Sequence, residues 1–504
     1  MIDIHTLQLR HQKDLRVLVP ECSLTIQAGD KLALIGEEGN GKSTLLKFLY
    51  DKNLVADYVD WSGSIQSTFS RAGYLPQMFP QTLDAVTLYD YFFLDEDIDF
   101  ARLYRLAGQV GFDSERLASH QTIGSLSGGE RLKVQLLKLL STPHDILFLD
   151  EPSNDMDLET LKWLEGYIAS AKETIVFISH DPEFLSRTAN RILHLEMLKK
   201  KREAQIALAN VDYETYVMER QNRLEKQRQQ AINDRKEFSK KEARFKRVHD
   251  SVQHALREMH DSTQGRLLAK KMHAVKAKEG LLKREEKELT ERPDQEAAID
   301  LFFERGSQLS RDKVLLQVEK EVVRRGEKVI LPSISWTLKS GQKVAITGQN
   351  GLGKTSFLKH LLDKAKGRST LKVAYMPQNY EEALEMGLSP LDFLSPNGKK
   401  EEKEMVRSRL ASLQFTRDEI YHEMRDLSGG QMAKVLLLYL VLSQPDLLIL
   451  DEPTRNLSPL SHEQVVKLFQ DFQGTLVCVS HDRRFMDQVC DQVYELTPEG
   501  LVEK

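Results

Sequence analysis

Short, continuously apolar runs alternate with amphipathic segments in the two outer parts of the chain, whereas the middle part is polar almost throughout. The runs KLALI, ILFL, KVAIT and LLIL, at 31–35, 146–149, 343–347 and 447–450, have the length of buried strands. Helical patterns, LLKFL and FLKHLL, follow the first and third of these runs. Strands that alternate with helices in this way predict α/β domains at both ends of the chain.

The middle of the chain has the pattern of two long helices. No proline occurs between Lys199 and Pro293, and the only glycines there are Gly265 and Gly280. A turn signal, HDSTQGR at 260–266, separates two narrow apolar seams of the kind found in coiled-coil helices. The first seam is Leu224, Ile232, Phe238, Phe245 and Val252, and the second is Leu268, Met272, Val275, Leu282 and Leu289.

These seams predict an antiparallel helical hairpin with its tip near 250–265, in which Asp261 or Ser262 caps the returning helix. An arm of about 40 helical residues would reach roughly 60 Å at about 1.5 Å per residue. The expected domains are therefore 1–199, a linker at 200–309, and 310–504.

Length and composition limit the class of protein. At 504 residues with 40% hydrophobic content, the chain has room for two or three domains with real cores. No stretch approaches the roughly 20 apolar residues that a membrane helix needs, and the closest, VLLLYLVL at 435–442, is expected to be a buried helix or strand. The N-terminus lacks a signal-peptide pattern, and three scattered cysteines favour neither disulfides nor a zinc site. We therefore expect a cytoplasmic protein.

Charge is distributed unevenly along the chain. From Arg220 to Arg284 there are 19 Lys and Arg against 8 Asp and Glu, a net charge of +11, although the formal net charge of the whole chain is −5. A basic middle between acidic ends indicates a polyanionic partner. The alternative is a solvated coiled coil that only separates two domains, but the charge is lopsided and clusters towards the predicted tip.

The two outer parts carry one series of motifs twice. GEEGNGKST at 36–44 and GQNGLGKTS at 348–356 both match the phosphate-loop pattern G-x-x-x-x-G-K-[ST]. Four further motifs recur in the same order, each copy 301 residues after the first. They are YLPQ and YMPQ with Gln77 and Gln378, LSGG with Ser127 and Ser428, LDEP with Asp150 and Asp451, and SHD with His180 and His481.

The residue types in these motifs suit the binding of ATP with Mg²⁺. The glycines let backbone N–H groups wrap phosphates, the lysine neutralises β- and γ-phosphate charge, and the next hydroxyl ligates Mg²⁺. A carboxylate at the end of an apolar strand can also hold Mg²⁺. The nucleotide-binding residues are Gly36, Gly39, Gly41, Lys42, Ser43 and Thr44, and Gly348, Gly351, Gly353, Lys354, Thr355 and Ser356; the candidate metal ligands are Ser43, Thr355, Gln77, Gln378, Asp150 and Asp451.

Because five motifs appear twice in order, residues 1–199 and 310–504 resemble ATP-binding cassette ATPase domains. The resemblance implies that Glu151 and Glu452 are general bases, that Gln77 and Gln378 sense Mg²⁺ and water, and that His180 and His481 contact the γ-phosphate. It also implies that each LSGG segment completes the ATP site of the opposite cassette. Ser428, Gly429 and Gly430 would then complete the site of Lys42, and Ser127, Gly128 and Gly129 the site of Lys354.

Two departures from this family's pattern concern details of the sites. The family usually stacks adenine on an aromatic residue before the first cassette strands, and neither LRHQKDLRVLVP nor EKEVVRRGEKVILP contains one. After the catalytic glutamate the first copy reads PSNDMD and keeps Asp157, whereas the second reads PTRNLS and has Ser458 at that position. We expect the two ATP sites to differ in activity.

Twin cassettes joined by a basic helical hairpin resemble the ABC-F proteins, which act on the ribosome. DYETYVMER at 212–220 and GRLLAKKM at 265–272 are similar to that family's linker. The resemblance implies a ribosome partner, through rRNA and possible tRNA contacts of a hairpin that enters the tRNA exit site and points towards the peptidyl-transferase centre. It also implies a monomer with intramolecular pairing of its cassettes and no membrane subunit. The outline without a long insertion in the first cassette resembles the antibiotic-resistance members.

Two other classes remain open. A tandem ATPase subunit of an ABC importer has this size and two cassettes, but its linker would be short and not basic. A chromosome-maintenance ATPase has a coiled coil that splits one cassette, whereas here each motif series is complete on its own side. Co-purification with membranes rather than ribosomes would favour the importer.

Overall fold

The structure is a computed structural model that describes residues 1–154, 156–198, 203–257, 262–290, 293, 299, 301–303, 312–325, 328–368 and 370–504. The chain forms two compact units. One consists of Met1–Tyr213 with Glu296–Lys504 and holds both motif series, and the other is Glu214–Gln295. The domain limits at 199/200 and 309/310 stay a prediction.

The first cassette is built on a six-stranded sheet in the order β5-β6-β7-β3-β8-β9. Its first five strands are parallel and β9 is antiparallel to β8. The central strands β3, β6 and β7 are buried at every residue, as expected for apolar runs covered on both faces. The strands are β3 (Lys31–Ile35), β5 (Ala72–Leu75), β6 (Ile146–Asp150), β7 (Thr174–Ile178), β8 (Arg191–Met197) and β9 (Glu203–Ala209).

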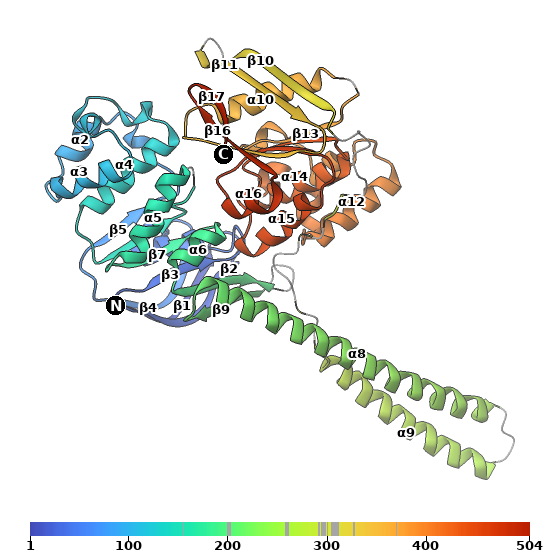
Figure 1. Ribbon diagram of the computed structural model, residues 1–504. Helices are drawn as coiled ribbons and strands as arrows, with labels where there is room; N and C mark the ends of the chain where they lie inside the picture. Colours follow the sequence, from blue (N-terminus) through green and yellow to red (C-terminus); the bar gives the residue numbers. More distant parts are fainter. Residues whose placement is uncertain are drawn as a thin grey trace. The chain divides into compact units, whose positions relative to one another are not determined.

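An antiparallel sheet of three strands and a set of helices complete this cassette (Figure 1). The small sheet has the order β2-β1-β4, with β1 (Ile2–His11), β2 (Val17–Ile26) and β4 (Val59–Ser67). The helices are α1 (Lys42–Tyr50), α2 (Leu88–Phe93), α3 (Phe100–Gln109), α4 (Gly128–Ser141), α5 (Leu158–Ser170) and α6 (Pro182–Thr188). Short 3₁₀ turns are η1 (Lys52–Leu54), η2 (Gln81–Leu83), η3 (Ser114–Ala118) and η4 (Ile123–Ser125).

The second cassette repeats this plan. Its six-stranded sheet has the order β13-β14-β15-β12-β16-β17, again with five parallel strands and an antiparallel last strand. The strands are β12 (Lys343–Thr347), β13 (Val373–Met376), β14 (Leu447–Asp451), β15 (Thr475–Val479), β16 (Gln492–Thr497) and β17 (Gly500–Glu503), and a two-stranded sheet pairs β10 (Val314–Arg325) with β11 (Lys328–Lys339).

The helices of the second cassette begin after the same motifs as those of the first, with α10 after the phosphate loop and α14 after LSGG. They are α10 (Lys354–Lys366), α11 (Pro390–Leu394), α12 (Lys400–Ser412), α13 (Arg417–Tyr421), α14 (Gly429–Ser443), α15 (His462–Gln470) and α16 (Arg483–Val489), with 3₁₀ turns η5 (Tyr380–Glu382), η6 (Met424–Asp426) and η7 (Pro459–Ser461). The apolar stretch at 435–442 lies in α14, and its buried side chains belong to the core of this cassette. The prediction of two α/β P-loop domains is therefore confirmed.

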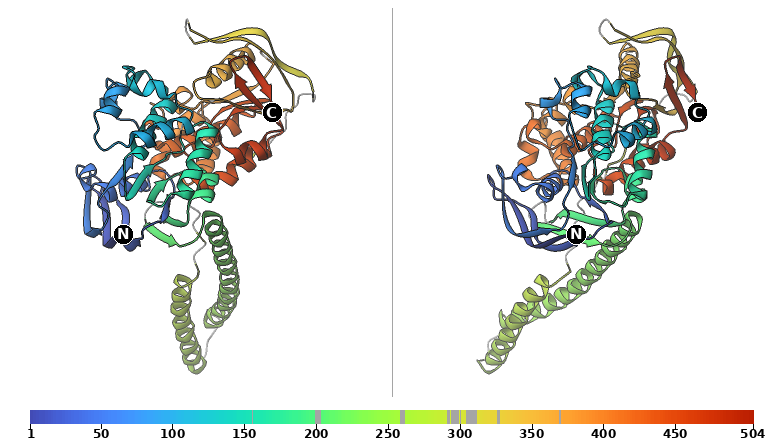
Figure 2. Two further views of the ribbon diagram at one scale, coloured as in Figure 1. Left: turned by 60° about the vertical axis from the view of Figure 1, so that its left-hand side comes forward. Right: turned by 90° about the vertical axis from the view of Figure 1, so that its left-hand side faces the viewer.

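The second unit is a hairpin of two helices, α8 (Tyr213–Arg257, 45 residues) and α9 (Ser262–Lys287, 26 residues). The helices lie side by side in every view (Figure 2). Lys241 Nζ lies 2.9 Å from Glu285 Oε2, and Thr290 Oγ1 donates to Asp234 Oδ2 at 2.5 Å. Lys241 follows Asp234 in the chain, whereas its partner Glu285 precedes Thr290. The two helices are therefore antiparallel, as predicted.

The predicted seams are mostly correct. Phe238 and Phe245 of α8 are half-buried, and Val275 of α9 is buried. Ile232 was the wrong seam residue, because its side chain is 42% exposed whereas the neighbouring Ala231 is only 4% exposed. Ala231 lies seven residues after Leu224 and seven before Phe238, so it continues the heptad spacing of the seam, which Ile232 does not. The predicted tip lies partly outside the described residues, at 258–261.

None of the helices in the described parts of the chain has the length and hydropathy of a membrane-spanning segment. This agrees with the sequence, where α14 is the most apolar helix and ends after 15 residues. In α8, the exposed side chains instead include a dense group of cations: Lys240, Lys241, Arg244, Lys246 and Arg247.

Candidate active sites

The first phosphate loop runs from the end of β3 into α1. Gly36, Gly39 and Gly41 have φ of +140°, +81° and +86°, in the region that other residues rarely adopt. A Cβ at Gly36 would also lie 2.3 Å from the backbone oxygen of Leu195 in β8. Lys42 Nζ donates to the carbonyl oxygen of Gly36 at 2.9 Å. The loop therefore closes around its own ammonium group, as a phosphate-binding loop requires.

The second phosphate loop runs from β12 into α10 and has the same geometry. Gly348, Gly351 and Gly353 have φ of +136°, +85° and +93°. Lys354 Nζ donates to the Gly348 oxygen at 2.7 Å and to Asn350 Oδ1 at 3.2 Å. Burial lowers the pKa of Lys354, which is the direction expected for an ammonium group removed from water.

Each loop hydroxyl lies beside the aspartate that ends an apolar strand. Ser43 Oγ donates to Asp150 Oδ1 at 3.0 Å, and Thr355 is hydrogen-bonded to Asp451. Both aspartates are 1% exposed, and burial raises the pKa of Asp150 to about 6. Among the described residues, Asp451 Oδ2 is buried without a hydrogen-bond partner. Hydroxyl and carboxylate oxygens in this arrangement fit Mg²⁺, which prefers such ligands.

Glu151 follows Asp150 and lies beside His180. Glu151 has a positive φ of 53°, a strained conformation for a residue with a side chain. His180 Nε2 lies 3.2 Å from Glu151 Oε1, and Asn154 Nδ2 donates to Glu151 Oε2. Burial alone would raise the pKa of Glu151, but His180, Lys42 and Asn154 outweigh it and lower the pKa to about 2. This carboxylate is therefore ionised at neutral pH.

Glu452 repeats this backbone conformation with a different electrostatic environment. Its φ is also 53°, and it accepts a hydrogen bond from the His481 backbone N–H at 3.3 Å. Burial and the neighbouring Asp451 raise the pKa of Glu452 to about 8. Burial and Lys354 lower the pKa of His481 to about 4, so this imidazole is neutral. The two glutamates thus occupy equivalent positions but differ in charge state.

Both LSGG segments begin a helix. Ser127 is the N-cap of α4 and forms a capping box with Glu130, and Ser428 forms the same box with Gln431 at the start of α14. The glycines that follow have no side chains of their own, so a negatively charged group can approach the backbone N–H groups of the first turn closely. Such a helix N-terminus is a site for an anion.

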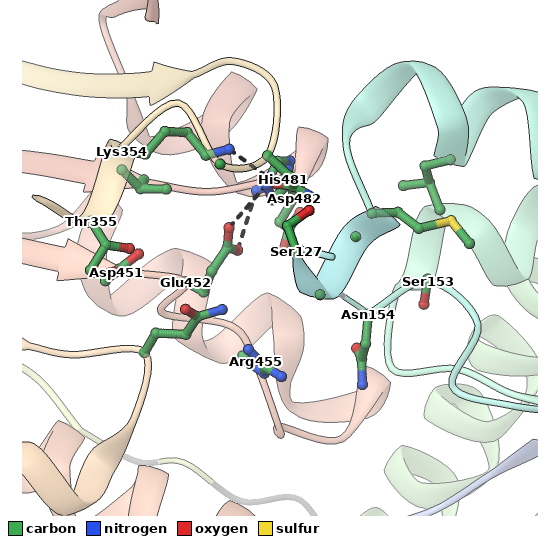
Figure 3. Close-up of a pocket in the computed structure, with 18 of the residues that line it drawn as sticks. Ser127, Ser153, Asn154, Lys354, Thr355, Asp451, Glu452, Arg455, His481 and Asp482 are labelled. Carbon is green, nitrogen blue, oxygen red and sulfur yellow. Dashed lines mark hydrogen bonds and ion pairs between the residues drawn. The ribbon is translucent and has the colours of Figure 1, made fainter. Parts of the chain in front are cut away.

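One cavity contains the motifs of both cassettes and has a volume of about 450 Å³. Ser127, Ser153 and Asn154 line it from the first cassette, and Lys354 and Glu452 are among the residues that line it from the second (Figure 3). Ten further sequence-predicted residues also line it: Gly128, Gly129, His180, Gly351, Gly353, Thr355, Ser356, Gln378, Asp451 and His481. The structure therefore brings together the second phosphate loop, Asp451, His481 and the first LSGG segment, in the combination that the sequence predicts.

The site of the first phosphate loop is closed by direct contacts with the second cassette. Gly430 N donates to Glu38 Oε2, and Lys434 Nζ lies 2.6 Å from Glu37 Oε1. His180 Nδ1 lies 2.8 Å from the carbonyl oxygen of Leu457, and since a carbonyl only accepts, Nδ1 donates. Lys42 and the second LSGG segment therefore belong to one site, but protein side chains fill part of it.

The remaining predicted residues lie at the edges of these sites. Gln77 follows β5 by two residues and its side chain is exposed, and Thr44 lies in α1. Near the first loop, where the family's aromatic residue is missing, Arg16 Nη2 donates to the Gly39 oxygen at 3.0 Å. At the second loop, Ile330 lines the cavity.

Sequence reasoning missed several residues that the structure places in the sites. They are Glu37, Glu38 and Lys434 in the first site, and Arg455 and Asn154 in the second. A signal was available for the first group. The phosphate loop of the first copy has Glu37 and Glu38 where the second has neutral Gln349 and Asn350.

Comparison with known proteins places these sites in one class, the twin-cassette ATPases. A family model described as ABC transporter matches residues 19–154 and 331–455, which together are more than half of the chain. The probable ATP-binding protein YheS of Escherichia coli (strain K12) is 28% identical, over 98% of this chain and 78% of its own length. The putative ATP-binding protein YdiF of Bacillus subtilis (strain 168) is 26% identical, over 95% and 77%.

An eukaryotic relative and a solved structure extend the comparison. ABC transporter F family member 5 of Arabidopsis thaliana is 28% identical, over 80% of this chain and 55% of its own length. The archaeal ribosome recycling factor aABCE1, solved in complex with the ribosomal stalk protein aP1, superposes with a TM-score of 0.61 at 18% identity, over 99% of this chain and 90% of its own. The chain belongs to the ABC transporter family and, within it, to the ABC-F proteins. It is an ATPase.

Proposed function

We propose that this protein binds ATP with Mg²⁺ at two composite sites and couples their closure to an action of its hairpin on the ribosome. Two observations together support this proposal. Each candidate ATP site contains residues of both cassettes, and the chain also has a separate, basic helical hairpin. ATP stabilises the closed form of the sites because its phosphates bridge a phosphate loop and the opposite LSGG segment.

The roles of the site residues follow from their chemistry. Lys42 and Lys354 neutralise phosphate charge, and the LSGG N–H groups hold the terminal phosphate at a helix N-terminus. Ser43 with Asp150, and Thr355 with Asp451, would hold Mg²⁺, which would supply positive charge to the phosphates. Glu151 or Glu452 accepts a proton from the attacking water while the adjacent histidine orients the terminal phosphate.

The proposed partner of the hairpin is ribosomal RNA. Five cations of α8 between Lys240 and Arg247 are exposed, and cations on a rod bind phosphate by releasing counterions. The hairpin has no cluster of exposed aromatic residues among its described side chains, so phosphate contacts rather than base stacking supply the binding. The solved relatives include a chain described as ribosome-bound archaeal Pelota and ABCE1, which supports a ribosomal role for this architecture.

We further propose that α8 and α9 reach the tRNA exit region and act towards the peptidyl-transferase centre. At about 1.5 Å per residue, the 45 residues of α8 span roughly 68 Å, and this length supports an action in the interior of a large partner. The proposed function of the hairpin at that place is to protect the ribosome against antibiotics. The protein would work as a cytoplasmic monomer whose own cassettes pair.

A second candidate function, the tandem ATPase subunit of an ABC importer, shares the cassette chemistry. Such a subunit has to dock on membrane-embedded partners through its cassettes. The lopsided charge of the hairpin gives no advantage in that role, whereas it does in binding RNA. Ribosome association is therefore the better-supported function.

The test uses a variant that binds ATP but does not hydrolyse it. Glu151→Gln with Glu452→Gln leaves both phosphate loops intact and removes both bases, so the closed form should accumulate, sediment with ribosomes in a sucrose gradient containing ATP, and inhibit translation. Lys42→Ala with Lys354→Ala is the matched control, because it removes the phosphate contacts and should stay at the top of the gradient. Sedimentation with membranes and absence from the ribosome fractions would instead favour the importer.

A further inference from the structure

The acidic phosphate loop of the first site contacts the place where a terminal phosphate is expected. Glu38 Oε2 accepts a hydrogen bond from Gly430 N in the first turn of α14. A Cβ at Gly429 would lie 3.1 Å from both carboxylate oxygens of Glu38. The two glycines therefore let a carboxylate approach the helix backbone closely, and a negative charge already lies at this anion site.

A second contact between the cassettes holds the same loop. Lys434, one turn further along α14, pairs with Glu37 at 2.6 Å, and both side chains are nearly buried, at 9% and 12% exposure. A charge-assisted bond in such surroundings is stronger than one at the surface. The pair keeps the loop against α14, so that the neighbouring carboxylate of Glu38 stays at the helix end.

The equivalent lysines of the two cassettes, Lys133 and Lys434, form ion pairs with different partners. Lys133, the counterpart of Lys434, pairs with Asp157 of its own cassette at 3.1 Å. Ser458 replaces that aspartate in the second cassette, so Lys434 has no such partner in its own cassette. Glu37 supplies the missing carboxylate from across the interface. The loss of the aspartate at position 458 and the presence of Glu37 thus compensate each other in charge.

The second site lacks this arrangement. Asn350 stands at the position of Glu38, and its Oδ1 accepts from Lys354 Nζ at 3.2 Å within its own loop. The first LSGG segment then faces the cavity of about 450 Å³. No carboxylate of the phosphate loop competes there, because this loop has neutral residues at both positions.

We propose that Glu38 determines the nucleotide preference of the first ATP site by competing with the terminal phosphate for the N-terminus of α14. This inference rests on the proposed role of residues 428–430 in that site. ADP ends at the phosphate loop and leaves the contact between Glu38 and Gly430 in place. ATP has to displace the carboxylate, so the first site favours ATP over ADP less than the second site does.

The test measures binding to the first site alone. In a Lys354→Ala background, which disables the second phosphate loop, calorimetric titration gives the Kd of ADP and of a non-hydrolysable β,γ-imido analogue of ATP, each with Mg²⁺. Glu38→Gln keeps an acceptor of the same size but removes the charge. It should tighten binding of the ATP analogue about tenfold, the range of a hydrogen bond to a charged group, and change the Kd of ADP less than twofold.

The reciprocal change provides the matched variant. Asn350→Glu, in a Lys42→Ala background, places a carboxylate at the same position of the second site and should weaken the ATP analogue there without a comparable effect on ADP. If both variants keep the wild-type ratio of the two Kd values, or if both ligands change equally, the proposal for Glu38 is wrong. If the first site binds neither nucleotide even with Glu38→Gln, the ATP site itself is misassigned, and the proposal fails with it.

Discussion

Arg483 at the start of α16 forms an ion pair with Glu165 of α5, so the two cassettes are joined by charged side chains outside the phosphate loops. Glu165 is 5% and Arg483 11% exposed, and Glu183 of α6 lies 3.2 Å from the same guanidinium. The corresponding position in the first cassette is Pro182, so this contact exists once and makes the interface asymmetric.

Removal of Arg483 should destabilise the unit that holds both cassettes. Arg483→Ala leaves the buried carboxylate of Glu165 without its main partner, which costs about 3 kcal/mol or more, or roughly 6 °C or more in Tm for a cassette of this size. Differential scanning calorimetry measures the shift. Arg187→Ala is the matched control, because Arg187 lies 3.7 Å from the same carboxylate but is 54% exposed and should cost less than about 1 kcal/mol. Equal shifts in both variants would show that the buried pair is not important.

The two catalytic glutamates should contribute unequally to ATP hydrolysis. The second site opens into a cavity, whereas Glu38 and Lys434 close the first. Glu151→Gln and Glu452→Gln should therefore lower the steady-state ATPase rate by clearly different factors, the larger of them about tenfold or more, within the range for loss of a general base. Phosphate release at saturating ATP measures both, with the double variant as the baseline. Indistinguishable rates for the two single variants would contradict the asymmetry.

Much of this arrangement was predictable from local patterns. The strands β3, β6, β12 and β14 coincide with the apolar runs, because a strand covered on both faces needs only continuous apolar residues. The capping boxes at Ser127 and Ser428 each involve only four consecutive residues of the sequence. These features depend on nearby sequence alone.

The contacts between the cassettes depend on distant residues and could not be predicted in this way. Lys434 and Glu37 are 397 positions apart, and each looks like an ordinary charged residue in its own segment. The sequence shows that Ser458 replaces the aspartate found at Asp157 in the first cassette. That Lys434 then pairs with Glu37 can be seen only from the position of α14 against the first phosphate loop.

The stability of the interface should depend on pH through Asp181. Burial and the nearby Asp482 raise the pKa of Asp181 to about 6 from its ordinary value of 3.8. A carboxyl with a raised pKa binds its proton more tightly in the folded state, so its contribution to stability is full below about pH 4 and is lost as the pH rises through about 6.

Asp181→Asn tests this pH dependence. The variant keeps the helix cap, because an amide oxygen can accept from Glu183 N and Phe184 N as the carboxylate does. Its Tm should exceed that of the wild type above pH 6, by the equivalent of about 3 kcal/mol, and the difference should vanish near pH 4. Asp113→Asn, at an exposed cap, is the control and should show no such trend. A difference that stays constant from pH 4 to 8 would rule out the titration of Asp181.

The last prediction concerns the cations of α8. Lys240, Arg244, Lys246 and Arg247 are exposed, whereas Lys241 pairs with Glu285 across the hairpin and is left unchanged to keep that contact. If the four cations contact phosphates of ribosomal RNA, replacing them with Gln should weaken ribosome binding and reduce the slope of log K against log salt by about 3, since fewer counterions are released. Binding measured at three or more salt concentrations gives the slope.

The control removes the same charge from the cassettes, where Lys162, Lys172, Lys399 and Lys400 are also exposed. Those four Gln substitutions should leave the salt slope of ribosome binding within about one unit of the wild type, because they lie outside the hairpin. ATPase activity without ribosomes should stay the same in the α8 variant, since the residues of both ATP sites lie in the cassettes. A hairpin that only separates the cassettes predicts equal slopes for wild type and both variants, and that result would contradict contact between α8 and RNA.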